Sequence, residues 1–188
     1  MKLLTTLALI LLAATGAFAQ KDPPTKDVIF KDAANRFSIT YPPDWQAVPP
    51  DKGFQLKLEK GFGPQGRHVS NIVVGVTYLE SDKNTPLETL IEGLAKDLDK
   101  IEAAYKQTDV AAKIVASGRT RIAGRDAFYI QVDNAAPKID AADAKTISRT
   151  IFTWESGYYY TVSFIATEQT FKQAFAEFER IISTFTID

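Results

Sequence analysis

Two amphipathic segments, placed far apart in the chain, most strongly restrict the folds that this sequence can adopt. Apolar side chains recur at helical spacing on one face of residues 85–107, and three phenylalanines do the same in residues 168–182. Thr85 and Glu88 have the spacing of a capping box, which favours a helix start at this point. Both apolar faces must be buried, so the sequence predicts a further layer that covers the two helices.

We predict that this layer is a sheet, because the remaining segments follow β patterns. Residues 37–41 alternate apolar and polar side chains, as a half-buried strand does, whereas 69–80 is apolar on both faces and is expected at the centre of a sheet. Turns at 123–125 and 156–157, each with a glycine, predict two hairpins. The predicted strands are 37–41, 54–59, 69–80, 113–120, 127–133, 146–155 and 158–166. We therefore expect an α+β fold, an α/β/α sandwich in which two amphipathic helices cover an antiparallel β-sheet of about six or seven strands.

The N-terminus carries the pattern of a signal peptide. Lys2 precedes an apolar run over 3–14, and the small residues Ala17 and Ala19 precede Gln20, where signal peptidase is expected to cut. We therefore expect an exported protein, periplasmic or extracellular. No later segment approaches the roughly 20 apolar residues of a membrane span. The predicted organisation is a signal peptide at 1–19, a flexible lead-in at 20–27 and a single domain at 28–188.

Charge and cysteine content exclude several classes of partner. Without Lys2, the mature chain has 22 − 1 = 21 basic residues against 23 acidic ones, a net charge of −2. So balanced a protein has no electrostatic reason to bind nucleic acid. The chain has no cysteine, which excludes disulfides and a lipid anchor on a cysteine.

A glycine motif and a single histidine are the features of the sequence that could indicate cofactor binding or catalysis. Gly61–Gly66 (GFGPQG) matches the glycine pattern of dinucleotide sites, but these need a helix after the glycines, and the segment that follows is β-patterned. His68 is the only histidine, whereas a zinc site needs three or four nitrogen or sulfur ligands. No serine sits in a G-x-S-x-G elbow. We therefore expect a hairpin loop at 61–68, no cofactor and no enzyme activity.

Three carboxylates lie close together in the segment 133–145, at Asp133, Asp140 and Asp143. Calcium takes six to eight oxygen ligands, and the EF-hand spacing with its glycine is absent from this segment. We interpret it as a solvated acidic loop, and weak calcium binding by it stays open.

Three stretches of the chain, in this order, resemble the PsbP-like superfamily: NRFSITYPPDW at 35–45, GRTRIAGRDAFYI at 118–130 and FAEFERIISTF at 175–185. This group includes the extrinsic oxygen-evolving proteins of photosystem II and many exported bacterial relatives. The resemblance implies an antiparallel sheet between helices and a non-enzymatic binding or assembly role in the cell envelope, with an envelope protein as partner. It also leaves open a photosystem II type of extrinsic protein that binds calcium.

The sequence offers four candidate partner-binding residues. Phe62, Arg67 and His68 fall in the predicted loop, and aromatic and arginine side chains dominate interface energies. Trp45 lies at a corner after Pro42 and Pro43, where we expect the indole to pack, yet strand-end loops often carry function. Two further functions stay open: a small hydrolase and a ligand carrier, each with a site built from dispersed residues. A large apolar cavity would indicate the carrier.

Overall fold

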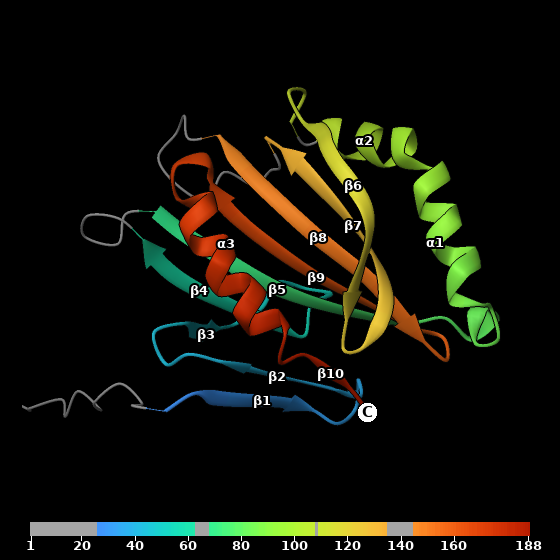
Figure 1. Cartoon of the computed structure of the whole chain (residues 1–188), viewed down its shortest axis with the longest axis horizontal. Helices are drawn as coiled ribbons and strands as arrows, with labels where there is room; N and C mark the ends of the chain where they lie inside the picture. The colour runs from blue at the N-terminus through green and yellow to red at the C-terminus, as the bar shows by residue number, and fades with distance from the viewer. Residues whose placement is uncertain (1–25, 63–67, 108, 135–144) are drawn as a thin grey trace, which may run out of the picture.

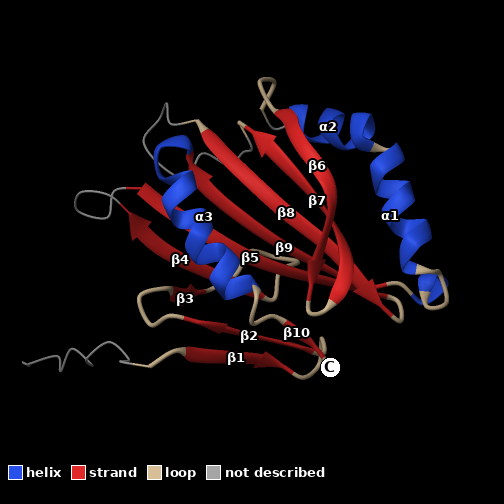
Figure 2. Ribbon diagram, in the orientation of Figure 1, coloured by secondary structure: helices blue, strands red, loops and turns tan. Residues whose placement is uncertain are grey.

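A computed structural model of the chain describes residues 26–62, 68–107, 109–134 and 145–188. The strands of the main sheet are β3 (Gln46–Val48), β4 (Leu56–Phe62), β5 (His68–Tyr78), β6 (Lys113–Ile122), β7 (Arg125–Asp133), β8 (Thr146–Glu155) and β9 (Tyr158–Thr167). A small second sheet consists of β1 (Val28–Asp32), β2 (Phe37–Tyr41) and β10 (Thr186–Ile187). The helices are α1 (Leu87–Lys96), α2 (Leu98–Lys106), α3 (Glu168–Ile182) and the short 3₁₀ helix η2 (Glu80–Asp82). Figures 1 and 2 show how these elements are arranged.

The main sheet is antiparallel throughout, in the order β3-β4-β5-β9-β8-β7-β6. The prediction of an α+β fold with an antiparallel sheet between helices is therefore confirmed. Both predicted hairpin turns also form: Ala123 and Gly124 join β6 to β7, and Ser156 and Gly157 join β8 to β9, all with positive φ. A positive φ at both central residues is what type I′ turns require.

Two predicted strand assignments differ from the structure. The strand at 37–41 forms, but it pairs with β1 and β10 in the small sheet rather than with the main sheet. The segment between the predicted strands 37–41 and 54–59 contains a further strand, β3, which pairs with β4 at the edge of the main sheet. The alternation of apolar and polar residues within a segment predicts a strand, but it does not specify which other strand that segment pairs with.

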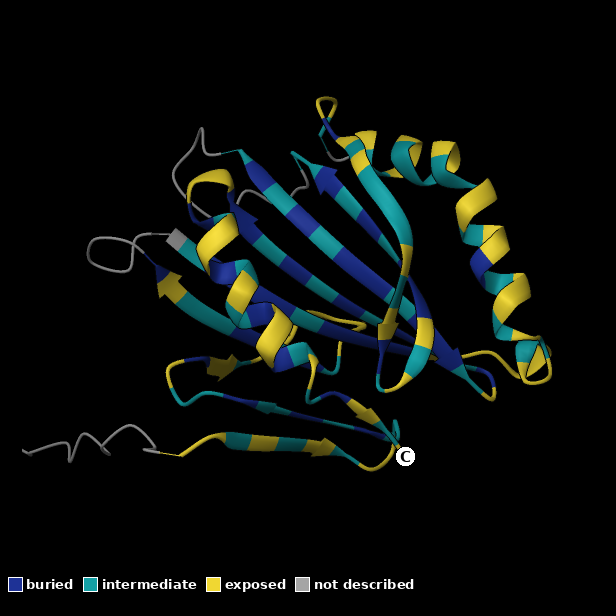
Figure 3. Ribbon diagram, in the orientation of Figure 1, coloured by how far each residue is buried: buried dark blue, intermediate teal, exposed yellow. Residues whose placement is uncertain are grey.

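The two faces of the main sheet bury separate hydrophobic cores, because successive side chains of a strand point to opposite faces. On β7, Ala127 and Tyr129 face the larger core, which α3 and the small sheet cover, whereas Phe128, Ile130 and Val132 face the smaller core, which α1 and α2 cover. Figure 3 shows that α1 and α2 are mostly exposed or half-buried along their length. The expected stripe of buried residues on this helix pair reduces to one fully buried side chain, Ile91.

The predicted single helix over 85–107 is broken into α1 and α2 at Asp97. This residue has φ −97° and ψ 16°, and its backbone N–H donates to the carbonyls of both Gly93 and Leu94. Glycine and aspartate are both weak helix formers, which explains a break at this place. The predicted cap is also wrong: α1 begins after Pro86, and within the described chain no side chain caps this end.

Candidate functional site

An apolar cavity lies between the helix pair α1–α2 and the strands β8 and β9. Its volume is about 470 Å³, which falls within the range of roughly 300–1,000 Å³ that small-molecule sites occupy. We call it the helix–sheet cavity. It is lined by Thr89, Leu90, Gly93, Leu94, Asp97, Lys100, Ile101 and Ala104 from the helix pair, and by Phe152, Thr153, Trp154, Tyr159, Tyr160 and Thr161 from the sheet.

Aromatic side chains form the floor of the helix–sheet cavity. Trp154 on β8 and Tyr159 on β9 are cross-strand neighbours, and their rings stack with centroids 5.6 Å apart and an interplanar angle of 20°. Trp154 is only 5% exposed, and Phe152 joins it from the same face of β8. A stacked aromatic pair gives the floor a large, rigid apolar surface.

The hydroxyl of Tyr159 fixes this floor to the segment that leads into α1. It donates a hydrogen bond to Oδ2 of Asp82 in η2. Burial, and then this carboxylate, raise the pKa of Tyr159 to about 12. The phenol therefore stays protonated at neutral pH, and its proton is held by Asp82 in a structural contact.

The helix pair is tied to the edge strand β6 on both sides of the break. Near the start of α1, Glu88 accepts a hydrogen bond from Nη1 of Arg119 at 2.8 Å, and this bond lowers the pKa of Glu88. In α2, Glu102 accepts the backbone N–H of Ile114 at 2.9 Å. The two ends of the helix pair are thus anchored, and the cavity lies beneath the middle of the pair, where Gly93 and Asp97 are.

Gly93 lies at an exposed edge of the cavity. A Cβ atom built on this residue meets nothing within 4 Å, and its φ is not positive. The backbone therefore does not need a glycine here, although glycine in a helix interior costs about 1 kcal/mol relative to alanine.

The mouth of the cavity carries one compensated ion pair. Nζ of Lys100 lies 2.8 Å from Oδ1 of Asp97. Both side chains line the cavity, together with the hydroxyl-bearing Thr89 and Thr161. The lining is therefore mostly apolar, with its charged side chains in one ion pair.

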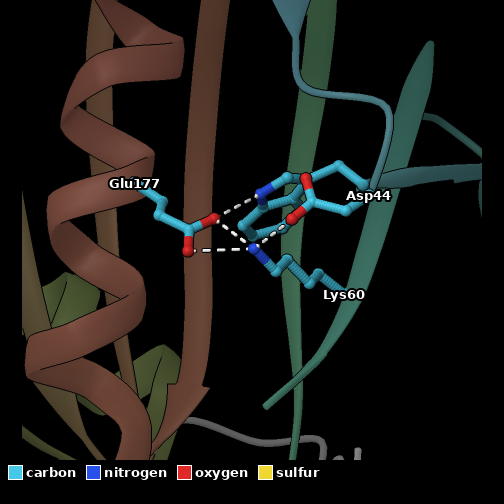
Figure 4. A network of polar contacts seen from close by, with 4 residues as sticks. Asp44, Lys60 and Glu177 are labelled. Atoms are coloured by element: carbon cyan, nitrogen blue, oxygen red, sulfur yellow. Dashed lines mark hydrogen bonds and ion pairs between the residues drawn. The ribbon is translucent and has the colours of Figure 1, made fainter. Parts of the chain in front are cut away.

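A second polar cluster, on the other side of the sheet, holds the corner of the chain at 42–45. Nζ of Lys60 contacts Oδ2 of Asp44 at 2.6 Å and both carboxylate oxygens of Glu177 at 2.7 and 2.9 Å (Figure 4). The indole N–H of Trp45 donates to the same Glu177 at 3.0 Å. Burial lowers the pKa of Lys60, but the hydrogen bonds to Asp44 and Glu177 outweigh it and raise that pKa. Each polar group has its partner within the cluster, which therefore ties the corner to β4 and α3.

The structure places the four predicted partner-binding residues in different surroundings. Trp45 is 1% exposed and Phe62 is 4% exposed, and their rings meet edge to face with centroids 6.1 Å apart. The expectation that Phe62 is exposed in a loop is therefore wrong, because β4 extends through Phe62 and its side chain enters the larger core. Trp45 packs at the corner, as predicted for 42–45. His68 is the first residue of β5, where it pairs with Phe62, and Arg67 lies outside the described residues.

Of the predicted acidic loop, Asp133 ends β7 and forms an ion pair with Lys145 at 2.9 Å, whereas Asp140 and Asp143 lie outside the described residues. In the part of the chain that the structure describes, no group of three or more histidine, cysteine or acidic residues is placed to hold a metal ion. None of the helices in that same part is long and apolar enough to cross a membrane.

The sequence pattern does not single out the residues of the helix–sheet cavity. Phe152, Trp154 and Tyr159 fit the pattern of sheet-forming aromatics, and Leu90 and Leu94 fit that of an apolar helix face. One signal was present in the sequence: Gly93 interrupts an otherwise helix-favouring segment.

Comparisons with known proteins agree with this architecture. A protein family described as PsbP matches residues 28–187. The chloroplastic PsbP domain-containing protein 3 of Arabidopsis thaliana is 26% identical over 183 residues, which cover 93% of this chain and 70% of that protein. The solution structure of cyanobacterial PsbP (CyanoP) from Synechocystis sp. has a TM-score of 0.59 at 14% identity and covers 94% of this chain and 99% of its own. LpqN of Mycobacterium tuberculosis, described as involved in cell envelope biogenesis, has a TM-score of 0.55 at 10% identity and covers 89% of this chain and 87% of its own.

Proposed function

Because the chain belongs to the PsbP family, we propose that it is an exported, non-enzymatic binding protein of the cell envelope whose ligand occupies the helix–sheet cavity. The observation that carries the proposal is the cavity itself: about 470 Å³ of space with an aromatic floor and one compensated ion pair at its mouth. Of the functions that the sequence leaves open, the ligand carrier is the one that this observation favours.

The chemistry of the lining supports binding rather than catalysis. The cavity residues include one carboxylate, Asp97, which is engaged by Lys100, and one aromatic hydroxyl facing the helices, Tyr159, which stays protonated. General acid–base or nucleophilic catalysis needs a positioned base beside its proton donor. The groups that line this cavity do not supply that pair.

Export to the envelope is supported by the signal-peptide pattern before Gln20 and by the description of LpqN, a protein of the same fold, as involved in cell envelope biogenesis. In this setting a protein partner in the envelope would supply the ligand or receive it. Mass spectrometry of the protein from an envelope fraction tests export: we expect a mature N-terminus at Gln20, whereas an intact Met1 in the cytoplasmic fraction would contradict it.

Binding in the cavity is tested with the apolar fluorescent probe N-phenyl-1-naphthylamine. We expect saturable binding to the wild type and its loss in Leu94→Glu, because a charged side chain then enters the apolar wall. Leu79→Glu is the matched control, since Leu79 is an exposed leucine outside the cavity. Equal binding by both variants would place the probe elsewhere and overturn the proposal.

A further inference from the structure

We infer that the ligand of the helix–sheet cavity is a single-chain amphiphile with an uncharged headgroup, whose acyl or alkyl chain lies on the Trp154–Tyr159 floor beneath Gly93. This inference rests on the proposed function and adds the chemical class of the ligand. Its three grounds are the size of the cavity, the open edge at Gly93 and the charges at the mouth.

The size of the cavity fits one hydrocarbon chain. A volume of about 470 Å³ corresponds to about 15 water molecules at ~30 Å³ each. A methylene group fills about the same volume as a water molecule, so a chain of up to about 15 carbons fits. Two such chains do not, which argues against a diacyl lipid held entirely inside.

Gly93 marks an open edge of the cavity, where a chain can enter. It is exposed, it lines the cavity, and a Cβ atom built on it meets nothing within 4 Å. Its φ is not positive, so the backbone does not require a glycine, and a glycine inside α1 is unfavourable for the helix. A side chain at this position would narrow the edge of the cavity.

The charges at the mouth favour an uncharged headgroup. Lys100 is the one cationic side chain among the described residues that line the cavity, and Asp97 compensates it at 2.8 Å. An anionic headgroup would have to compete with Asp97 for this lysine, and a cationic headgroup would have to compete with Lys100 for this aspartate. A neutral polar headgroup, such as a sugar or glycerol, can accept and donate hydrogen bonds here without breaking the pair.

The test uses n-alkyl maltosides of 8, 10 and 12 carbons below their critical micelle concentrations, with isothermal titration calorimetry on the mature chain. Each buried methylene should raise affinity by up to about fourfold. We expect affinity to rise along the series, and dodecanoate and dodecyltrimethylammonium to bind at least tenfold more weakly than dodecyl maltoside. Equal affinity for the 8- and 12-carbon maltosides would overturn the inference. So would an affinity for either charged amphiphile equal to that for dodecyl maltoside. The series needs no variant, so it stays decisive if a substitution impairs folding.

A cavity-filling variant localises the binding. Gly93→Leu adds a side chain at the open edge of the cavity and replaces a weak helix former by a strong one, so it should keep or raise the melting temperature. We expect it to bind dodecyl maltoside at least tenfold more weakly. Ala95→Leu is the matched control, because Ala95 is exposed on the same helix and does not line the cavity. Wild-type affinity in Gly93→Leu would contradict the inference.

The outcomes separate the two proposals. If N-phenyl-1-naphthylamine binds and Leu94→Glu abolishes its binding, but no maltoside binds, the proposed function stands and the ligand class is wrong. If neither the probe nor the maltosides bind, both are wrong.

Discussion

Removal of the half-buried Glu177 carboxylate should destabilise the protein more than removal of an exposed carboxylate on α3. In Glu177→Ala the indole N–H of Trp45, which is 1% exposed, loses its acceptor. A buried donor left without a partner costs about 1–3 kcal/mol, and the loss of one of the two carboxylates around Lys60 adds about 0.5–1 kcal/mol. We therefore expect a decrease of about 1.5–4 kcal/mol in the free energy of unfolding.

Urea unfolding, followed by far-UV circular dichroism, measures this decrease. Glu179→Ala, an exposed residue on the same helix, is the matched control and should change stability by less than about 0.5 kcal/mol. Glu177→Gln keeps an acceptor for Trp45 but loses the charge, so its effect should fall between the two.

A double-mutant cycle tests the cause of the effect. In a Trp45→Phe background the indole donor is gone, so Glu177→Ala should cost at least about 1 kcal/mol less than in the wild type. An undiminished effect in that background, or a Glu177→Ala effect no larger than that of Glu179→Ala, would refute the reasoning.

Three further predictions concern stability. Ser156→Asn should stabilise the protein by about 0.5–1 kcal/mol in thermal melts, because Ser156 has φ 49° in a type I′ turn and asparagine tolerates that conformation better; a lower melting temperature would contradict this. Ile91→Ala should cost about 2–5 kcal/mol in urea melts, whereas Leu94→Ala should cost about 1–2 kcal/mol, because Leu94 already borders the cavity; equal losses would mean that the cavity is closed in solution. The folded-state pKa of Tyr159 is raised from 10.0 to about 12, so its contribution to stability is complete below pH 10 and is lost as the pH rises to about 12. Stability should therefore fall less steeply over this interval in Tyr159→Phe than in the wild type, and an unchanged slope would contradict the assignment.

Much of the fold could be predicted from the sequence because its signals are local. The turns at Gly124 and Gly157 follow from residues that accept positive φ, and α3 follows from the spacing of its phenylalanines. The small sheet could not be predicted in the same way, because β2 pairs with β10, about 150 residues later in the chain. The break at Asp97 could not be predicted from the apolar spacing. This spacing continues across Asp97, whereas the helical backbone conformation does not.

The candidate site was largely beyond the sequence, since a cavity is a property of tertiary packing. The position of Phe62 is an example of what the sequence pattern could not predict. A glycine-rich segment predicted a loop, but β4 extends into this segment and the Phe62 ring is buried against Trp45. In the same way, the leucines of α1 fit a fully buried stripe by spacing alone. In the structure these leucines are only partly buried against the smaller core, while Glu88 and Glu102 bond the helix pair to β6.

The most direct test of the binding site uses the two tryptophans as reporters on opposite sides of the sheet. Trp154 forms part of the floor of the helix–sheet cavity. Trp45 lies in the larger core, where its indole N–H donates a hydrogen bond to Glu177. In ¹H–¹⁵N spectra of the mature chain titrated with dodecyl maltoside, we expect the indole N–H signal of Trp154 to shift in a saturable manner while that of Trp45 stays in place. A shift confined to Trp45, or no shift of either signal at saturating dodecyl maltoside, would contradict the account.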